Sequence, residues 1–229
     1  SDLIRTENER PGTRDWLLTN TRVDPVTKYR CPWIEGYCSH TSLRAGDELR
    51  IMVSTNPASP LSIDIYRLGY YGGTGARQML QLGPFQGTIQ PDPPISPERL
   101  RECAWEPTAP VMIPADWPSG VYLGKLTAER EGLQSYVVFI VRDDRPADFL
   151  FQCSDHTWNA YNRWPSQFSL YDDGNEECDC DAQHERFSSE LRGRQIATRG
   201  SRRWPEEPGS SGLLRGFADA GNRRGCAWD

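Results

Sequence analysis

The last quarter of the chain is too poor in large apolar side chains to form a hydrophobic core. Between Asp173 and Asp229, only 6 of 57 residues are Val, Ile, Leu, Met or Phe. The same stretch contains nine Arg and no Lys, and it has no hydrophobic period of 2 or 3.6 residues. Such a segment buries too little apolar surface to offset the conformational entropy lost on folding. We therefore predict that residues 175–229 form a disordered tail and that the folded part lies upstream.

Upstream of that tail, short apolar segments alternate with turn residues, which is typical of a β-sandwich. The sequence LSIDIY at 61–66 places three aliphatic residues on one face of a strand and polar residues on the other. Further strands are predicted at 48–53, 121–126 and 136–141. The last of these is apolar on both faces, which predicts a place inside a sheet. The residues expected in the sandwich core are Ile51, Val53, Ile63, Ile65, Val121, Val138 and Ile140.

The charged run 142–146 ends in a proline and predicts a domain boundary after residue 145. Beyond it, a predicted strand at 149–151 leads into a polar and aromatic segment, as at the opening of an α/β unit. The predicted fold is therefore mainly β: an immunoglobulin-like β-sandwich followed by the start of an incomplete α/β domain and the disordered tail. The predicted divisions are an N-terminal extension (1–29), the sandwich (30–145), the start of the α/β domain (146–174) and the tail (175–229).

Charge and cysteine content narrow the classes of partner and compartment. The net charge of -6 argues against nucleic-acid binding, and no apolar run approaches the length of a membrane span. Seven cysteines, an odd number scattered along the chain, favour a reducing cytoplasm. Cys31 and Cys38 are close enough in sequence to close a short loop in an oxidising compartment, an alternative that spacing leaves open.

The segment 154–174 is the richest in groups that carry chemistry. It contains His156, Trp158, Tyr161, Trp164 and Tyr171, together with several carboxylates and amides. Tyrosine is a sound ligand for ferric iron, because a Lewis-acidic metal lowers the pKa of the phenol that it binds. The alternative is that these aromatics pack the entry to a second domain, with their polar tips in water.

Four motifs in order give the chain a resemblance to a known family. They are IEGY at 34–37, YRLGYYGG at 66–73, WPSGVY at 117–122 and the segment 154–174. Together they resemble the C-terminal region of the large (beta) subunit of N,N-dimethylformamidase. The resemblance implies hydrolysis of small amides at a mononuclear iron held by two Tyr and one Glu. It implies Tyr161 as one metal ligand and Tyr171 as the candidate for the second. Association with a small subunit, or a homo-oligomer, is expected on the same ground.

After Gly174 the sequence departs from the pattern of that family. The family continues with a Phe-Asp-Arg-Pro-Tyr-like segment and a later Glu in a His-Asp-Glu-Tyr-Trp-like segment, and neither is present here. We interpret the chain as an incomplete, inactive amidohydrolase, truncated or frame-shifted after about residue 174. Its aromatic cluster around Trp158, Tyr161 and Trp164 is then expected to be partly exposed and to favour self-association. The alternative function is a non-enzymatic β-sandwich module that binds a partner through its loops.

Limited proteolysis tests the predicted tail. Because residues 175–229 lack the apolar residues for a core, proteases should trim the chain back toward residue 174 and leave the sandwich intact. Mass spectrometry of the stable fragment measures the end point. A C-terminal segment that resists digestion as well as the sandwich does would contradict the prediction.

Overall fold

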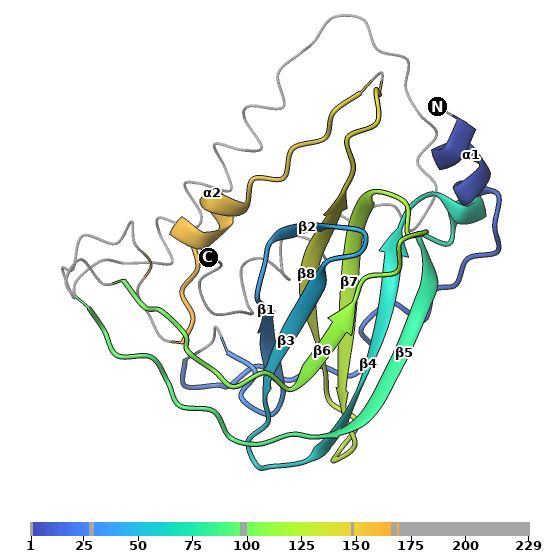
Figure 1. Cartoon of the computed structure of the whole chain (residues 1–229). Coiled ribbons are helices and arrows are strands. Elements are labelled where there is room, and N and C mark those ends of the chain that lie inside the picture. The colour runs from blue at the N-terminus through green and yellow to red at the C-terminus, as the bar shows by residue number, and fades with distance from the viewer. Residues whose placement is uncertain (1, 28–29, 97–99, 148, 166–168, 170–229) are drawn as a thin grey trace, which may run out of the picture. The chain divides into compact units, whose positions relative to one another are not determined.

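The computed structural model in Figure 1 describes residues 2–27, 30–96, 100–147, 149–165 and 169. The tail expected over 175–229 lies outside these residues, so its disorder stays a prediction. The described residues are mainly in strands, and these strands form two sheets. This confirms the mainly β fold that the alternating apolar segments predicted.

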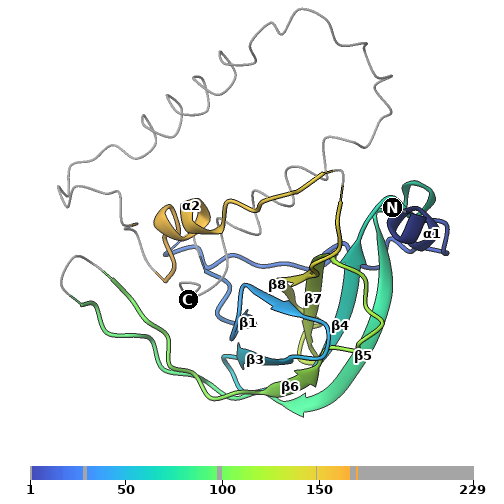
Figure 2. The ribbon, with the colours of Figure 1, turned by 45° about the horizontal axis from the view of Figure 1, so that its top comes forward.

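The two sheets face each other as two layers (Figure 2). The smaller sheet has the order β1-β3-β6, with β1 at Glu35–Cys38, β3 at Glu48–Ser54 and β6 at Ala109–Met112. The larger sheet has the order β2-β8-β7-β4-β5, with β2 at Ser42–Arg44, β4 at Pro60–Leu68, β5 at Ala76–Gln86, β7 at Gly120–Ala128 and β8 at Gln134–Arg142. All neighbouring strands are antiparallel except β2 and β8, which run parallel.

The main hydrophobic core lies between the two sheets. Ile51 and Val53 of β3 face Ile63 and Ile65 of β4, and all four side chains are fully buried as predicted. In the larger sheet, Phe139 of β8 stacks on Tyr122 of β7, with ring centroids 5.4 Å apart, and Trp117 stacks on the same tyrosine at 4.9 Å. The Tyr122 hydroxyl donates to the Pro118 carbonyl oxygen at 2.6 Å, so this large polar side chain is buried without an unsatisfied group.

The predicted core residues of β7 and β8 were assigned to the wrong face. Val121, Val138 and Ile140 are only partly buried, whereas Val137, Phe139 and Val141 belong to the core between the sheets. The reason is that β8 is apolar on both faces, so hydrophobicity does not show which parity points inward. Its place between β2 and β7 confirms the prediction that it lies inside a sheet.

The N-terminal segment covers the outer face of the larger sheet. Trp16 is buried there against Tyr66, Leu123 and Tyr136, in a second hydrophobic cluster. Lys125 of β7 donates to the carbonyl oxygens of Asp15 at 2.7 Å and Leu17 at 3.0 Å. Burial lowers the pKa of Lys125. The residues predicted as an extension are thus packed on the sandwich and explain why both faces of β7 and β8 are apolar.

The segment after β8 differs from the predicted strand and domain entry. No strand forms at 149–151, and the only regular element in the described residues after β8 is the short helix α2 (Asp155–Ala160). α2 and the N-terminal helix α1 (Asp2–Asn8) are both too short and polar to cross a membrane.

Cys38 of β1 is a buried free thiol, so the bridge between Cys31 and Cys38 that spacing left open is not formed. Burial raises the pKa of the Cys38 thiol. Because the thiolate is the reactive form, this cysteine is a packing residue of β1.

Truncating Phe139 tests the two-layer core. Phe139→Ala should lower the free energy of unfolding by about 3–5 kcal/mol, because it removes a fully buried ring stacked on Tyr122. Urea denaturation measures the change. Met112→Ala removes an exposed side chain of β6 and is the matched control, with an expected change below about 0.5 kcal/mol. Equal losses in the two variants would mean that the core is not where the structure places it.

Candidate functional site

The motif that carries the proposed metal ligand lies at the end of α2. The helix is closed by main-chain hydrogen bonds, from the Trp158 N–H to the Ser154 oxygen at 3.0 Å and from the Tyr161 N–H to the Thr157 oxygen at 3.1 Å. Tyr161 is the residue that ends the helix, and its side chain is 42% exposed. α2 thus presents this phenol at the protein surface.

Trp164 anchors the α2 segment to the sandwich. Only 4% of its surface is exposed, and its indole N–H donates to the Glu35 Oε2 at 2.8 Å. Its ring meets the Trp105 ring edge to face, with centroids 5.9 Å apart and an interplanar angle of 74°. The Arg30 guanidinium lies over the Trp164 ring, 5.1 Å from the ring centroid. The hydrogen bond between Trp164 and Glu35 joins residues 129 positions apart in the sequence.

Glu35 is the buried carboxylate to which this anchor binds. Arg30 donates to the Glu35 Oε1 from Nη2 at 2.6 Å and from Nε at 2.9 Å. The same guanidinium donates to Asp92, at 2.7 Å and 2.9 Å. Burial raises the pKa of Glu35, and the hydrogen bonds from Arg30 and Trp164 oppose that rise. A buried charge with fixed donors on both oxygens is costly to disturb, since each lost donor leaves an unpaired buried atom.

A second polar contact lies next to Trp164, inside an aromatic cluster. The Tyr37 hydroxyl accepts a hydrogen bond from the main-chain N–H of Trp105 at 3.0 Å and donates to the main-chain carbonyl oxygen of Cys103 at 3.2 Å. The Tyr37 and Trp105 rings lie 5.5 Å apart. Together with Met52 and Trp164 they form one buried cluster. This contact fixes the long connection between β5 and β6 against β1, where it meets Trp164.

The expected exposure of the aromatic cluster is correct only in part. Tyr161 is exposed and Trp158 is partly buried, but Trp164 is not exposed, because it is anchored on Glu35. Trp164 is thus a packing group, as the alternative proposed, but it packs on the sandwich and its polar N–H binds Glu35 instead of water. Arg30 and Glu35 were missed as site residues. A signal was present, since Glu35 is a carboxylate within the apolar sequence WIEGY and needed a buried partner.

The described residues contain only part of the iron site that the resemblance implies. Tyr161 is placed on α2, whereas Tyr171 lies outside the described residues. In the described part of the chain, no group of three or more His, Cys, Asp or Glu side chains is close enough to hold a metal ion. Tyr161 is therefore the one ligand implied by the resemblance that lies within the described residues.

A second buried polar network joins α1 to the turn after β4. The Tyr71 hydroxyl donates to the Glu7 Oε1 at 2.8 Å and accepts from the Arg67 Nη1 at 2.9 Å. Arg77 of β5 pairs with the same Glu7 oxygen at 2.7 Å. Burial raises the pKa of Tyr71. Tyr71 has a φ of 40°, in the left-handed region that side chains disfavour, so the network holds this turn against backbone strain.

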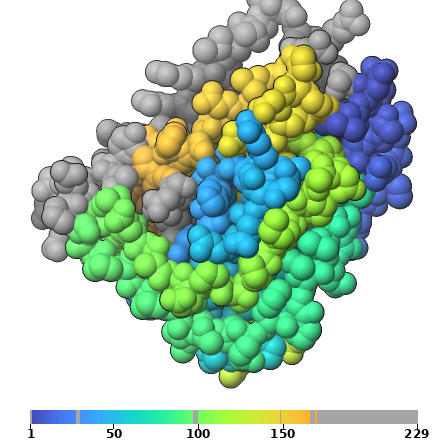
Figure 3. Space-filling model, in the orientation of Figure 1, coloured from blue at the N-terminus to red at the C-terminus, as the bar shows by residue number. Residues whose placement is uncertain are grey.

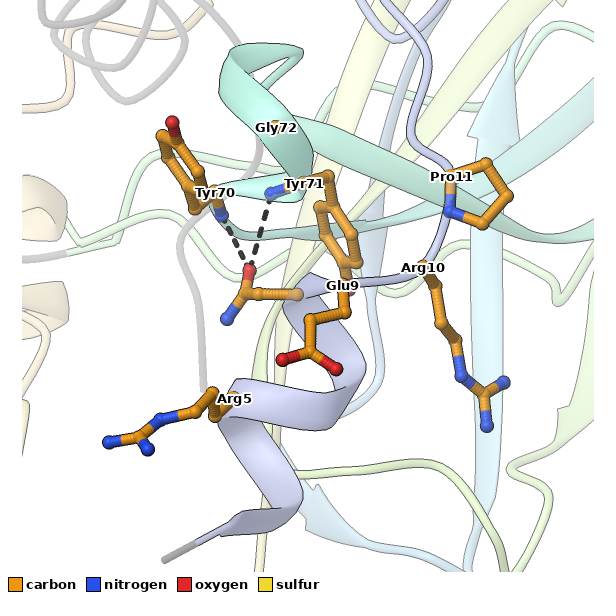
Figure 4. Close-up of a pocket in the computed structure, with 8 residues that line it drawn as sticks. Arg5, Glu9, Arg10, Pro11, Tyr70, Tyr71 and Gly72 are labelled. Carbon is orange, nitrogen blue, oxygen red and sulfur yellow. Dashed lines mark hydrogen bonds between the residues drawn. The ribbon is translucent and has the colours of Figure 1, made fainter.

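An open cavity of about 630 Å³ lies between α1 and this turn (Figure 4). Asn8 closes one side, where its Oδ1 accepts from the main-chain N–H groups of Tyr70 at 2.6 Å and Tyr71 at 3.4 Å. The guanidinium ends of Arg5 and Arg10 extend in opposite directions in Figure 4, away from a common point. Because its charged groups do not converge, this cavity lacks the polar focus of a ligand site. The N-terminal residues, dark blue in Figure 3, pack beside the turn on this side of the molecule.

Removing one N–H from the anchor tests its strength. Trp164→Phe keeps an aromatic ring but deprives the Glu35 carboxylate of a donor, so the free energy of unfolding should fall by about 1–3 kcal/mol. Hydrogen exchange of the α2 amides should speed up in parallel, because the segment loses its attachment. Trp158→Phe is the matched control, since no hydrogen bond of the described residues uses the Trp158 indole N–H. Equal effects of the two substitutions would contradict the anchor.

Comparison with known proteins supports the resemblance. The family model for the N,N-dimethylformamidase beta subunit-like, C-terminal region matches residues 62–208, which is more than half of the chain. The match begins within β4 and runs past Gly174, where we expected the chain to depart from the family pattern. A search of the curated proteins finds no match. From the family match, the chain belongs to the N,N-dimethylformamidase beta subunit-like family.

Proposed function

We propose that this chain is related to iron-dependent hydrolases of small amides and is an incomplete, inactive form that does not hold iron by itself. The observation that carries the proposal is the position of Tyr161. Its phenol is exposed at the end of α2, and no group of three or more His, Cys, Asp or Glu side chains in the described part of the chain could hold a metal ion. The sandwich then serves as the platform that holds the α2 segment through Trp164 and Glu35.

The sequence downstream supports the same proposal. An iron held by two Tyr and one Glu needs ligands beyond Tyr161, and a single phenolate binds ferric iron weakly. Although the family match runs to residue 208, the sequence contains neither the Phe-Asp-Arg-Pro-Tyr-like segment nor the His-Asp-Glu-Tyr-Trp-like segment. Tyr171 is the remaining candidate for a second ligand, and the Glu has no counterpart. Small amides are therefore proposed as the substrates of the related enzymes, and this chain is not expected to hydrolyse them.

The proposal extends to location and association. We place the chain in the cytoplasm on its scattered, odd number of cysteines. The family is that of a beta subunit, which supports association with a small subunit or with further copies of the chain.

Metal content after purification with added iron tests the proposal. The unmodified chain and Tyr161→Phe should both hold negligible iron and lack the phenolate-to-iron charge-transfer absorption, because one phenol does not make a site. Neither protein should release dimethylamine from N,N-dimethylformamide. Inductively coupled plasma mass spectrometry and visible absorption measure the first two properties.

Tyr70→Phe is the matched control, because it removes another exposed phenol on a different part of the chain. Stoichiometric iron that is lost in Tyr161→Phe and kept in Tyr70→Phe would overturn the proposal and make the chain a metalloenzyme. Small and equal amounts of iron in all three proteins would mean adventitious binding and would support it.

A further inference from the structure

Residues 13–20, which we call the strap, lie across the outer face of the larger sheet from the start of β5 to the start of β8. At one end, the Thr13 N–H donates to the Ala76 carbonyl oxygen at 2.8 Å. At the other end, the Gln134 N–H donates to the Asn20 carbonyl oxygen at 2.9 Å. The strap forms no strand of its own, so the sheet holds it as it would hold a peptide laid across its surface.

Side chains of β7 and β8 bind the main chain of the strap. Lys125 of β7 donates to the carbonyl oxygens of Asp15 at 2.7 Å and Leu17 at 3.0 Å. Between them, the Tyr136 hydroxyl of β8 donates to the Trp16 carbonyl oxygen. Three carbonyl groups in a row are thus satisfied by side chains of the sheet.

The Gln134 side chain at the start of β8 binds the next part of the strap. Its Oε1 accepts from the main-chain N–H of Thr19 at 2.8 Å and from that of Asn20 at 3.3 Å. Contacts to main-chain atoms do not depend on which side chains the bound segment carries. Leu17 agrees with this, because its main chain is bound while its side chain is 40% exposed. The face therefore recognises an extended main chain.

Trp16 is the side chain of the strap for which the sheet forms a pocket. Its ring packs against Tyr66 and Leu123 and is only 5% exposed. Its indole N–H donates to the Thr74 carbonyl oxygen at 3.0 Å. Gly75 has a φ of 92°, and a Cβ at this position would lie 3.0 Å from the indole ring, so the close approach of the ring needs a glycine. The pocket thus fits a ring of this size with a donor at this edge.

We propose that the outer face of the larger sheet is a binding site for an extended peptide that carries a tryptophan, and that the strap is its resident ligand. The strap shares no continuous ladder with the sheet, whereas β7 and β8 pair along their length. It therefore opens as a unit while the sandwich stays folded, and a peptide of the same kind can enter the emptied site. This site is independent of the iron chemistry proposed above.

Hydrogen exchange of the unmodified chain tests whether the strap opens alone. The main-chain amides of Thr13, Thr19 and Asn20 donate within the strap's contacts to the sheet. They should exchange at least about tenfold faster than the paired amides of β7 and β8, because local opening costs less than unfolding of the sandwich. Equal rates in the strap and in these strands would overturn the proposal, since the strap would then leave only when the sandwich unfolds.

Fluorescence anisotropy of a labelled synthetic peptide with the sequence of residues 11–22 tests the site itself. Trp16→Ala removes the ring that holds the chain's own strap, so this variant should bind the peptide saturably. The unmodified chain should bind the peptide at least about tenfold more weakly, because its tethered strap competes at a high effective concentration. Leu17→Ala is the matched control, since it shortens an exposed neighbour in the strap and should behave like the unmodified chain.

The peptide with Ala in place of Trp should bind the Trp16→Ala chain at least about a hundredfold more weakly than the unmodified peptide, because it cannot fill the pocket. Circular dichroism checks that each variant is folded. If Trp16→Ala does not fold, Trp16→Phe, which keeps a ring but loses the bond to Thr74, should bind the peptide more tightly than the unmodified chain does. No peptide binding to a folded Trp16 variant, or equal binding to all the proteins, would overturn the proposal.

Discussion

The buried carboxylate of Glu35 connects three parts of the chain that are distant in sequence: residues 30–35, Asp92 and Trp164. It lies on β1, and the side chains of Arg30 and Trp164 supply its hydrogen bonds. Through Arg30 it also reaches Asp92 in the connection between β5 and β6. A carboxylate removed from water tolerates no loss of a donor, so these segments can leave their places only together. The position of α2 and Tyr161 on the sandwich therefore depends on one charge.

That carboxylate can be buried only because both faces of β1 are covered. All four residues of β1 are buried, although the strand has a neighbour in the sheet on one side alone, β3. One face belongs to the core between the sheets, and the other carries Tyr37 and the aromatic cluster with Trp105 and Trp164. The smaller sheet thus has no solvent-facing side at β1. The aromatic residues supply the low-polarity surroundings in which the pair of Arg30 and Glu35 is formed.

The strands were largely predictable because their signal is local, while the site was not, because its contacts are long-range. Period-2 patterning located β3, β4, β7 and β8. It could not choose the inward face of β8, because Trp16 of the N-terminal segment covers the outer face and makes that face apolar as well. The long strand β5 was missed, since its Gly83 and Pro84 interrupt the pattern at an irregular part of the ladder. Tyr161 was singled out by the family resemblance, and its role as a metal ligand stays a prediction. The partners of Glu35 were not singled out, because spacing in sequence does not show which cation or indole meets a buried acid.

The segment between β8 and Trp164 joins these two results. Its first end is fixed by β8 in the larger sheet, and its second end is fixed by Trp164 on Glu35. Between these attachments, the most apolar residues, Phe149 to Phe151, are the ones that the described residues leave uncovered. The anchor of Trp164 on Glu35 that presents Tyr161 therefore also restricts the position of this apolar segment, because the chain between β8 and Trp164 is held at both ends.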